Sequence, residues 1–248
     1  MESVELLELF DEVTAAIRGA LDHVDDWGLS GQVAGQYGFD VVADDAARPL
    51  LDAAGVGILS EESGLHDPHR EVTVVIDPVD GSTNASLGIP WFATSLCAVD
   101  GEGPLAALVV NQATGERYEA VRGGGARVDG VEIAPSRCFE MNDAMVGING
   151  LSPRHLGWRQ SRSLGAAALE LCAVASGRLD AFFDAVKDGL APWDYLGGML
   201  ICQEAGAFMA DAFDRPLLEL DHGVRRTVAA AATEQVLGEL IAAQNSFW

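Results

Sequence analysis

The sequence predicts a protein of mixed α and β structure built in two parts, and three features of the chain support this. The chain has 248 residues, enough for one large domain or two smaller ones that share an interface. Strand-like segments follow one another through the first half, whereas strands alternate with helices in the second half. We therefore expect an N-terminal α+β subdomain over residues 1–140 and a C-terminal α/β subdomain over residues 141–248.

Apolar periodicity and turn residues locate the elements of the first half. Leu6, Phe10, Val13 and Ile17 recur at steps of three or four residues, which predicts an amphipathic helix. A β-branched run that ends before Pro78 predicts a strand, because proline and glycine commonly stop strands. The expected elements, in order, are helices over 3–24 and 44–55 on either side of a glycine-rich loop over 28–38, then strands over 71–76, 92–99, 105–110 and 117–121.

The second half alternates short apolar runs with longer stretches rich in alanine and leucine. The short runs predict strands, and the longer stretches predict helices. The expected elements are strands over 145–148, 179–186 and 227–232, helices over 164–176 and 194–205 between them, and a helix at the C-terminal end.

A strongly acidic composition limits the partners of the protein. The formal net charge is −23, and Lys187 is the only lysine. A surface of this charge repels DNA, RNA and anionic lipid, so we expect no nucleic-acid partner and no membrane partner. It would also repel a phosphorylated substrate unless the site contained cations, which makes bound metal a natural candidate.

Cysteine usage and the N-terminal segment indicate a cytoplasmic protein. The four cysteines are far apart and lie among apolar neighbours, as expected of reduced thiols in a core. Residues 1–25 are acidic and amphipathic, unlike a secretory signal peptide, and the chain contains no apolar run of about 18 residues that would span a membrane.

The most informative segment follows the strand expected over 71–76 and reads IDPVDGSTN over residues 76–84. Pro78 fixes the backbone so that Asp77 and Asp80 can converge, which leaves the Val79 carbonyl as a further oxygen ligand. Magnesium prefers carboxylate, carbonyl and water oxygens. If residues 81–84 open a helix, their N–H groups form a phosphate site. An ordinary hairpin turn is the alternative, because Asp-Pro and Asp-Gly are common turn dipeptides.

Three other acidic segments are candidates for the same site. Glu61 and Glu62 follow an apolar segment, where they either bind metal or begin a solvated helix. Asp194 either caps the next helix or binds metal, and a carboxylate has enough lone pairs for both. Asp44 and Asp45 precede the second expected helix and give the weakest of these signals.

Taken in order, these segments resemble the motifs of the inositol monophosphatase family, the lithium-sensitive, metal-dependent phosphatases. The family's GEE, DP(I/V)DG(T/S)TN and WDxAAG motifs correspond to residues 60–62, 77–84 and 193–198. The resemblance covers nearly the whole chain, since it extends to residues 90–95, 123–126, 162–169, 177–181 and 204–206. It implies a layered α/β/α/β/α sandwich with the site between two halves, and a homodimer.

The resemblance also implies which residues bind metal. Glu61, Asp77 and the Val79 carbonyl would bind one Mg²⁺, and Asp77, Asp80 and Asp194 would bind a second. Glu61 would also touch a third, looser ion, so two or three ions are expected. Two metal ions can activate a water and stabilise the leaving oxygen of an in-line displacement.

Catalytic and phosphate-binding roles follow from the same resemblance. Asp45 would pair with the Ser82 hydroxyl, and the pair would orient and help deprotonate the attacking water. The N–H groups of Gly81, Ser82 and Thr83 would bind the phosphate oxygens. Phosphoryl transfer depends mostly on positioning and charge neutralisation, which such a set of groups supplies.

The substrate side of the site departs from the family pattern. Gly165 and Ala167 would line it, but a family glutamate that grips substrate hydroxyls is replaced by Lys187. Asp184 and Asp188 lie nearby in sequence as stand-ins for that glutamate. The substrate expected is therefore a small phosphorylated polyol whose exact alcohol is open.

Several functions remain open from the sequence. We expect Mg²⁺-dependent hydrolysis of inositol monophosphate or a similar polyol phosphate. Histidinol phosphate, fructose 1,6-bisphosphate and 3′-phosphoadenosine 5′-phosphate are the alternative substrates, although the short connection from Asn84 to Trp91 favours a monoester. A non-catalytic regulatory protein of the same fold is the remaining alternative, and the retained metal-binding carboxylates argue against it.

Overall fold

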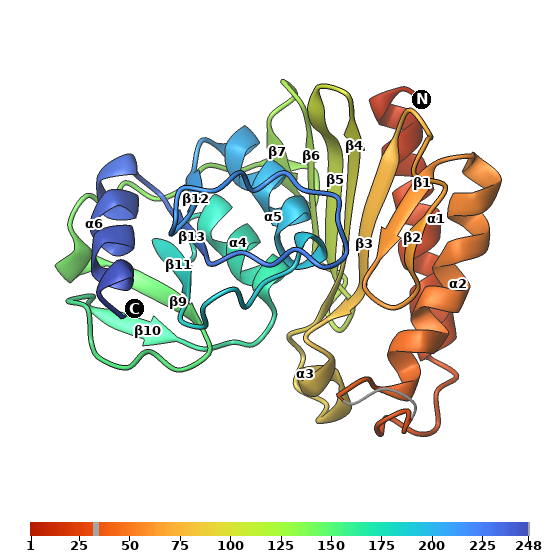
Figure 1. The fold of residues 1–248 in the computed structure, drawn as a ribbon, viewed down its shortest axis with the longest axis horizontal. Helices are drawn as coiled ribbons and strands as arrows, with labels where there is room; N and C mark the ends of the chain where they lie inside the picture. The colour runs from red at the N-terminus through yellow and green to blue at the C-terminus, as the bar shows by residue number, and fades with distance from the viewer. Residues whose placement is uncertain (32–34, 248) are drawn as a thin grey trace.

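The computed structural model describes residues 1–31 and 35–247 and shows five layers that alternate between helices and sheets (Figure 1). Helices α1 (Ser3–Leu21) and α2 (Gly38–Ala54) cover the outer face of the first sheet. Helices α4 (Ala167–Ala175) and α5 (Pro192–Ala205) lie between the two sheets, and α6 (Glu234–Gln244) covers the second sheet from outside. The predicted layered α/β/α/β/α sandwich is confirmed. Part of the loop predicted over 28–38, residues 32–34, lies outside the described residues.

The first sheet has eight strands in the order β2-β1-β3-β4-β5-β6-β7-β8. All neighbouring pairs are antiparallel except β1 and β3: the chain reverses into β2 on the outer side of β1 and reverses again into β3, so β3 runs parallel to β1. The strands are β1 (Gly57–Ser60), β2 (Gly64–His66), β3 (Thr73–Asp80), β4 (Ala93–Asp100), β5 (Gly103–Asn111), β6 (Arg117–Val121), β7 (Ala126–Val128) and β8 (Val131–Glu132).

The second sheet has five strands in the order β10-β9-β11-β13-β12. Strand β9 is parallel to both of its neighbours, and β13 is antiparallel to β11 and β12. The strands are β9 (Met145–Asn149), β10 (Gln160–Arg162), β11 (Ala181–Asp184), β12 (Phe208–Asp211) and β13 (Val228–Ala231). Short helical turns α3 (Ser82–Ser86), η1 (Met141–Asp143) and η2 (Asn245–Phe247) complete the fold.

The sequence prediction placed the start of α2 wrongly. The helix begins at Gly38 rather than at residue 44. Its first turns bury Phe39, Asp40, Ala43 and Asp44, so the buried face contains two carboxyl groups. Apolar periodicity does not detect a face of that kind, so it predicts the helix only from residue 44 onwards.

Helix α5 is apolar around most of its circumference because it is enclosed on every side. It packs against the first sheet, against α4 and against β12. A Cβ atom on Gly197 would lie 2.7 Å from Ser95 Oγ, and one on Gly198 would lie 2.6 Å from Leu171 Cβ. These two glycines therefore let α5 approach both β4 and α4, which brings the N-terminus of α5 to the end of β3.

The two sheets are separate in sequence, but the helical layer between them belongs to both. Strand β8 ends at Glu132 and β9 begins at Met145. Helices α4 and α5 nevertheless share one apolar core with strands of both sheets. The division into subdomains 1–140 and 141–248 therefore stays a prediction. Among the described residues, none of the helices combines the length and apolarity needed to cross a bilayer.

Candidate active site

A bulge at the end of β3 brings Asp77 and Asp80 together. Strand β3 continues to Asp80, past the point where the sequence prediction ended it, and its register with β4 shifts between these two residues. Pro78 lies inside the bulge, where its missing N–H leaves no gap in the ladder. Asp77 Oδ1 accepts a hydrogen bond from Val79 N at 2.9 Å, and Thr94 Oγ1 donates to the Pro78 carbonyl at 2.8 Å. The bulge is thus fixed from both sides.

The third carboxylate comes from the first turn of α5. Ala191 is the N-cap and Pro192 the first helical residue, so the expectation that Asp194 would be the N-cap was wrong. Asp194 occupies the third helical position, and its Oδ2 accepts a hydrogen bond from Ala191 N at 2.6 Å. This is the reciprocal half of a capping box, which fixes the side chain at the helix start.

Asp77, Asp80 and Asp194 form the acid cluster of this structure. Each offers one carboxylate oxygen, and the three oxygens lie within 4.8 Å of one another. Asp77 and Asp80 are buried. Three hard oxygen donors at this separation suit a divalent cation such as Mg²⁺, Mn²⁺ or Ca²⁺.

Glu61 joins the cluster from the residue after β1. Its backbone N–H donates to the Ile76 carbonyl at 3.2 Å, which continues the parallel pairing and places the side chain beside Asp77. Burial, the charge of Asp194 and the charge of Glu62 raise the pKa of Glu61 to about 8. Glu62 points elsewhere, since its carboxylate accepts a hydrogen bond from Gln36 Nε2.

The four carboxyl groups lie in a buried environment that disfavours their charged forms. Burial and then the neighbouring carboxylates raise the pKa of Asp77 and of Asp80 well above the usual range. Burial raises the pKa of Asp194 to about 6, against the opposing effects of Ala191 N–H and the Arg225 charge. Four carboxyl groups in one buried place repel each other when ionised. Bound divalent cations would remove that repulsion, so the donor set fits them.

The turn after Asp80 packs against the segment that leads into α4. Gly81 has φ of +91°, and a Cβ atom there would lie 3.1 Å from the Gly165 carbonyl, from the Trp91 carbonyl and from Ala166 Cβ. Ala167 N donates to Asp80 Oδ1 at 3.2 Å, and Ala168 N donates to Asp80 Oδ2 at 2.7 Å. The structure therefore brings the predicted residues Gly165 and Ala167 to the cluster.

Helix α3 begins directly after this turn. Its first helical hydrogen bond runs from Ala85 N to the Gly81 carbonyl at 3.1 Å. The N–H groups of Gly81, Ser82 and Thr83 precede it and have no place in the helical ladder. Ser82 Oγ donates to the Val79 carbonyl at 2.8 Å, so the predicted carbonyl ligand shares its oxygen with this hydroxyl.

The pairing of Asp45 with Ser82 is contradicted by the structure. Asp45 is exposed on the outer face of α2. The carboxyl group close to Ser82 is that of Asp40. Burial raises the pKa of Asp40 to about 7, and the Ser82 hydroxyl opposes this rise. Asp40 Oδ1 is buried without a hydrogen-bond partner among the described residues. Asp44 lies one turn further along the same face, and its Oδ1 accepts a hydrogen bond from Ser60 Oγ at 2.5 Å.

The predicted substrate-side residues separate into two groups. Asp184 is buried at the end of β11, where Oδ1 accepts hydrogen bonds from Asn149 Nδ2 and Val186 N, and burial raises its pKa to about 7. Its Oδ2 has no hydrogen-bond partner in the described part of the chain, and the charge of Asp194 acts on it. Asp184 thus belongs to the surroundings of the cluster.

Lys187 and Asp188 contact a different segment. Lys187 Nζ lies 5.0 Å from the ring centre of Phe213, and Asp188 Oδ1 accepts a hydrogen bond from Arg215 at 2.6 Å. Asp188 N also donates to Thr227 Oγ1 at 2.8 Å. These contacts hold both residues against the segment 211–227 rather than against the acid cluster.

Two residues near the cluster, His222 and Arg225, were not foreseen from the sequence. The Trp193 ring lies 4.7 Å from the His222 ring and 5.0 Å from the Arg225 guanidinium carbon. His222 Nε2 and the Glu61 carbonyl oxygen are 3.1 Å apart. No sequence pattern marks His222 or Arg225, because a long segment with little regular structure, between β12 and β13, brings them to the site.

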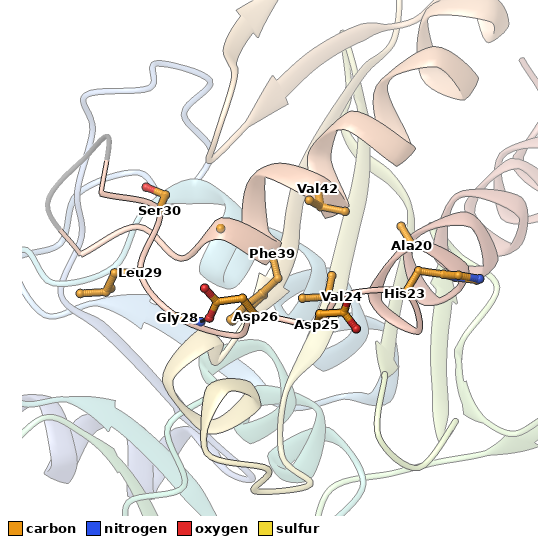
Figure 2. A pocket seen from close by; sticks show the side chains of 11 residues that line it. Ala20, His23, Val24, Asp25, Asp26, Gly28, Leu29, Ser30, Phe39 and Val42 are labelled. Atoms are coloured by element: carbon orange, nitrogen blue, oxygen red, sulfur yellow. Dashed lines mark hydrogen bonds between the residues drawn. The ribbon is translucent and has the colours of Figure 1, made fainter.

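A separate hollow of about 640 Å³ lies beside the start of α2 (Figure 2). Side chains from the end of α1, the following loop and α2 line it, among them His23, Asp26, Leu29, Phe39 and Val42. None of the described residues around it belongs to the acid cluster. Phe39 faces this hollow, whereas the next residue, Asp40, is close to Ser82.

Comparisons with known proteins identify relatives of this chain. The inositol monophosphatase family matches residues 51–247. A fructose-1,6-bisphosphatase/inositol-1-monophosphatase of Thermococcus kodakarensis is 35% identical over 215 residues, covering 83% of this chain and 81% of that protein. Nus factor SuhB of Xylella fastidiosa is 35% identical over 170 residues, covering 62% of this chain and 60% of that protein.

A solved structure gives the same result for the fold. The crystal structure of an inositol monophosphatase–fructose 1,6-bisphosphatase superimposes with a TM-score of 0.82 at 30% identity, covering 95% of this chain and 98% of that one. The fold and the matched family are those of phosphatases, hydrolases that act on phosphorylated small molecules. The chain belongs to the inositol monophosphatase family.

Proposed function

We propose that the protein is a Mg²⁺-dependent phosphatase that hydrolyses a small phosphate monoester, inositol monophosphate or a similar polyol phosphate. The observation that supports this most is the acid cluster, in which three carboxylate oxygens lie within 4.8 Å at the meeting point of β3 and α5. Bound Mg²⁺ ions would supply charge neutralisation and an activated water for in-line displacement. Two ions, or three with a looser one at Glu61, fit the number of carboxylates.

The chain's own groups would hold the metal and the phosphate. Asp77, Asp80, Asp194, Glu61 and the Val79 carbonyl supply hard oxygens for the cations. Because the amides at the start of α3 lie outside the helical ladder, those of Gly81 to Thr83 would donate to phosphate oxygens. Asp80 is already held by two N–H groups of α4, so metal binding needs little rearrangement of that side chain.

Asp40 replaces Asp45 as the proposed proton acceptor. The Ser82 hydroxyl has one proton, which it donates to the Val79 carbonyl. If the Val79 carbonyl served as a metal ligand, the Ser82 hydroxyl could instead turn towards Asp40 Oδ1, which has no hydrogen-bond partner among the described residues, and the two groups would orient a water. A carboxyl whose pKa is about 7 suits proton transfer near neutral pH.

The leaving alcohol is proposed to contact Asp184. Its buried Oδ2 lacks a partner among the described residues and can accept a hydrogen bond from a polyol hydroxyl. Lys187 and Asp188 are not proposed to bind substrate, since their contacts are with Phe213 and Arg215. We further propose a cytoplasmic homodimer without nucleic-acid or membrane partners, in keeping with the net charge of −23 and with the family.

A substrate panel tests the proposal. Phosphate release would be measured from inositol 1-phosphate, histidinol phosphate, fructose 1,6-bisphosphate and 3′-phosphoadenosine 5′-phosphate, each with Mg²⁺ and with EDTA. We expect Mg²⁺-dependent release that Asp80→Asn lowers by at least about 100-fold, because a cluster carboxylate is lost. Asp45→Asn is the matched control, since it removes an exposed carboxylate, and it should keep the activity.

The outcomes separate the alternatives. Preference for fructose 1,6-bisphosphate would assign the bisphosphatase activity named for the Thermococcus kodakarensis relative. Folded protein that neither binds Mg²⁺ nor releases phosphate would contradict the proposal. It would then favour the non-catalytic regulatory alternative, which is in keeping with a relative that is named as a Nus factor.

A further inference from the structure

Glu170 is a buried carboxyl group near the acid cluster, without a cationic partner among the described residues. It lies in the first turn of α4 with 1% of its surface exposed. Burial raises its pKa to about 7, and the groups that oppose this effect are the backbone N–H groups of Leu164, Gly165 and Ala166. A buried carboxyl is costly, so its presence needs a compensating role.

Residues 164–166 contact Glu170 on one side and the turn that follows Asp80 on the other. Leu164 N lies 3.5 Å from Glu170 Oε1. On the opposite side, Asn84 Nδ2 donates to the Leu164 carbonyl at 2.7 Å. Gly165, with φ of +84°, brings its carbonyl to within 3.1 Å of a Cβ position on Gly81. Residues 164–166 are therefore clamped between Glu170 and the turn that follows Asp80.

The next two residues orient Asp80. Ala167 N and Ala168 N donate to the two carboxylate oxygens of Asp80, at 3.2 and 2.7 Å. Because these N–H groups directly follow the clamped segment, a shift of residues 164–166 moves both donors together. Glu170 and Asp80 are thus linked through one rigid turn at the start of α4.

The surrounding fold makes room for this carboxyl group. Gly147 lies on β9 opposite Glu170, and a Cβ atom there would lie 2.9 Å from Glu170 Oε1. A larger residue at position 147 would therefore displace the Glu170 carboxylate. Leu179 and Phe182 close the remaining space, with atoms 3.0 and 3.3 Å from the same Cβ position.

We propose that Glu170 is a positioning residue, which fixes residues 164–166 from the interior so that the first N–H groups of α4 orient Asp80 for metal binding. It touches neither metal nor substrate. The inference rests on the proposed function to the extent that Asp80 binds Mg²⁺. Residues that orient metal ligands in this way commonly change metal affinity by about 10-fold to 100-fold when replaced.

Mg²⁺ affinity, measured by titration calorimetry well below the unfolding temperature, tests the proposal. We expect Glu170→Leu to raise the Mg²⁺ dissociation constant by about 10-fold. Asp180→Leu is the matched control, because Asp180 also accepts a backbone hydrogen bond, from Met145 N at 2.7 Å, but is not part of the cluster. Its dissociation constant should stay within about 2-fold of the parent value. Equal dissociation constants in both variants, or equal losses of affinity, would overturn the proposal.

Two further variants decide the matter if Glu170→Leu does not fold. Glu170→Gln keeps one acceptor oxygen for the N–H groups and should stay within about 3-fold of the parent affinity. Gly147→Ala keeps the carboxylate but displaces it, and should weaken Mg²⁺ binding by about 10-fold. Parent-like binding by Gly147→Ala would overturn the proposal.

Hydrogen exchange in EDTA makes the test independent of metal. The amides of Ala167 and Ala168 should exchange about 10-fold faster in Glu170→Leu or Gly147→Ala than in Asp180→Leu, because their bonds to Asp80 are loosened. Unchanged exchange would overturn the inference even if the parent protein binds Mg²⁺. If the parent binds no Mg²⁺, the proposed function fails and the exchange rates alone decide the role of Glu170.

Discussion

At the scale of single residues, Asp40 and Asp45 have the same side chain but different surroundings. Asp40 is buried, has an elevated pKa and has one oxygen without a hydrogen-bond partner among the described residues, whereas Asp45 is exposed on the same helix. Five residues along a helix correspond to a rotation of roughly 140° from the original direction, so both cannot face Ser82. The pair therefore offers a matched comparison within one element.

We expect Asp40→Asn to lower kcat by about 100-fold or more, because an amide cannot accept the proton of the attacking water. Mg²⁺ affinity should change little, since Asp40 is separate from the acid cluster. Asp45→Asn should leave both quantities unchanged. Steady-state kinetics with the preferred substrate, together with a Mg²⁺ titration, would check this. Equal activities in the two variants would exclude Asp40 as the proton acceptor.

At the scale of elements, the short turn between β3 and α3 determines how closely the end of β3 approaches the start of α4. Gly81 has a left-handed backbone and three atoms of Trp91, Gly165 and Ala166 at 3.1 Å from its Cβ position. Gly88 also has a positive φ, of +68°, but no atom of the described residues outside its immediate neighbours lies within 4 Å of its Cβ position. The two glycines thus separate the cost of backbone strain from the cost of a close approach.

Gly81→Ala is expected to lower the free energy of unfolding by about 2–3 kcal/mol, from left-handed strain plus contact with backbone oxygens. Gly88→Ala should cost about 1 kcal/mol, from strain alone. Urea denaturation of both variants measures the difference. If the two substitutions lower the free energy of unfolding equally, the turn around Gly81 has room for a methyl group. It then does not limit how closely β3 approaches the start of α4.

The elements also show what the sequence could and could not predict. Asp77 and Asp80 were predicted because a strand, a proline and a glycine act locally, and local geometry nearly determines where those carboxylates point. Asp40 was missed because the polar buried face of α2 hides the helix start. His222 was missed for another reason, since a segment with little regular structure brings it to Glu61 across 161 positions in sequence.

The short outer strands illustrate the same limit. Strands β2, β7 and β8 have two or three residues each, too few to give an alternation of apolar and polar positions. Their pairing with a longer neighbour defines them, and that pairing is a tertiary property. The layer order was likewise available only from the resemblance to a family, because periodicity shows that a helix has a buried face without showing which sheet covers it.

At the scale of the whole molecule, buried carboxyl groups make the metal-free protein sensitive to pH. The pKa values of Asp40, Glu170 and Asp184 are raised to about 7, that of Asp194 to about 6 and that of Glu61 to about 8, each chiefly by burial. In the unfolded chain these groups titrate near 4. Between pH 5 and 8 the folded state therefore binds more protons than the unfolded state.

The sign of the effect follows from this difference. Stability rises with pH only where the unfolded state binds more protons, so here the free energy of unfolding should fall as pH rises from 5 to 8. Each proton retained only by the folded state contributes about 1.4 kcal/mol per pH unit.

We therefore expect the thermal midpoint of the protein in EDTA to fall steadily between pH 5.5 and pH 8, and to fall less steeply in excess Mg²⁺. Cations would bind the ionised form of the cluster and so offset the loss on the alkaline side. Asp184→Asn should reduce the slope in EDTA, because it removes one of the protons concerned, whereas Asp45→Asn should not. A midpoint in EDTA that stays constant or rises over this range would show that these carboxyl groups are ionised in the folded protein without metal.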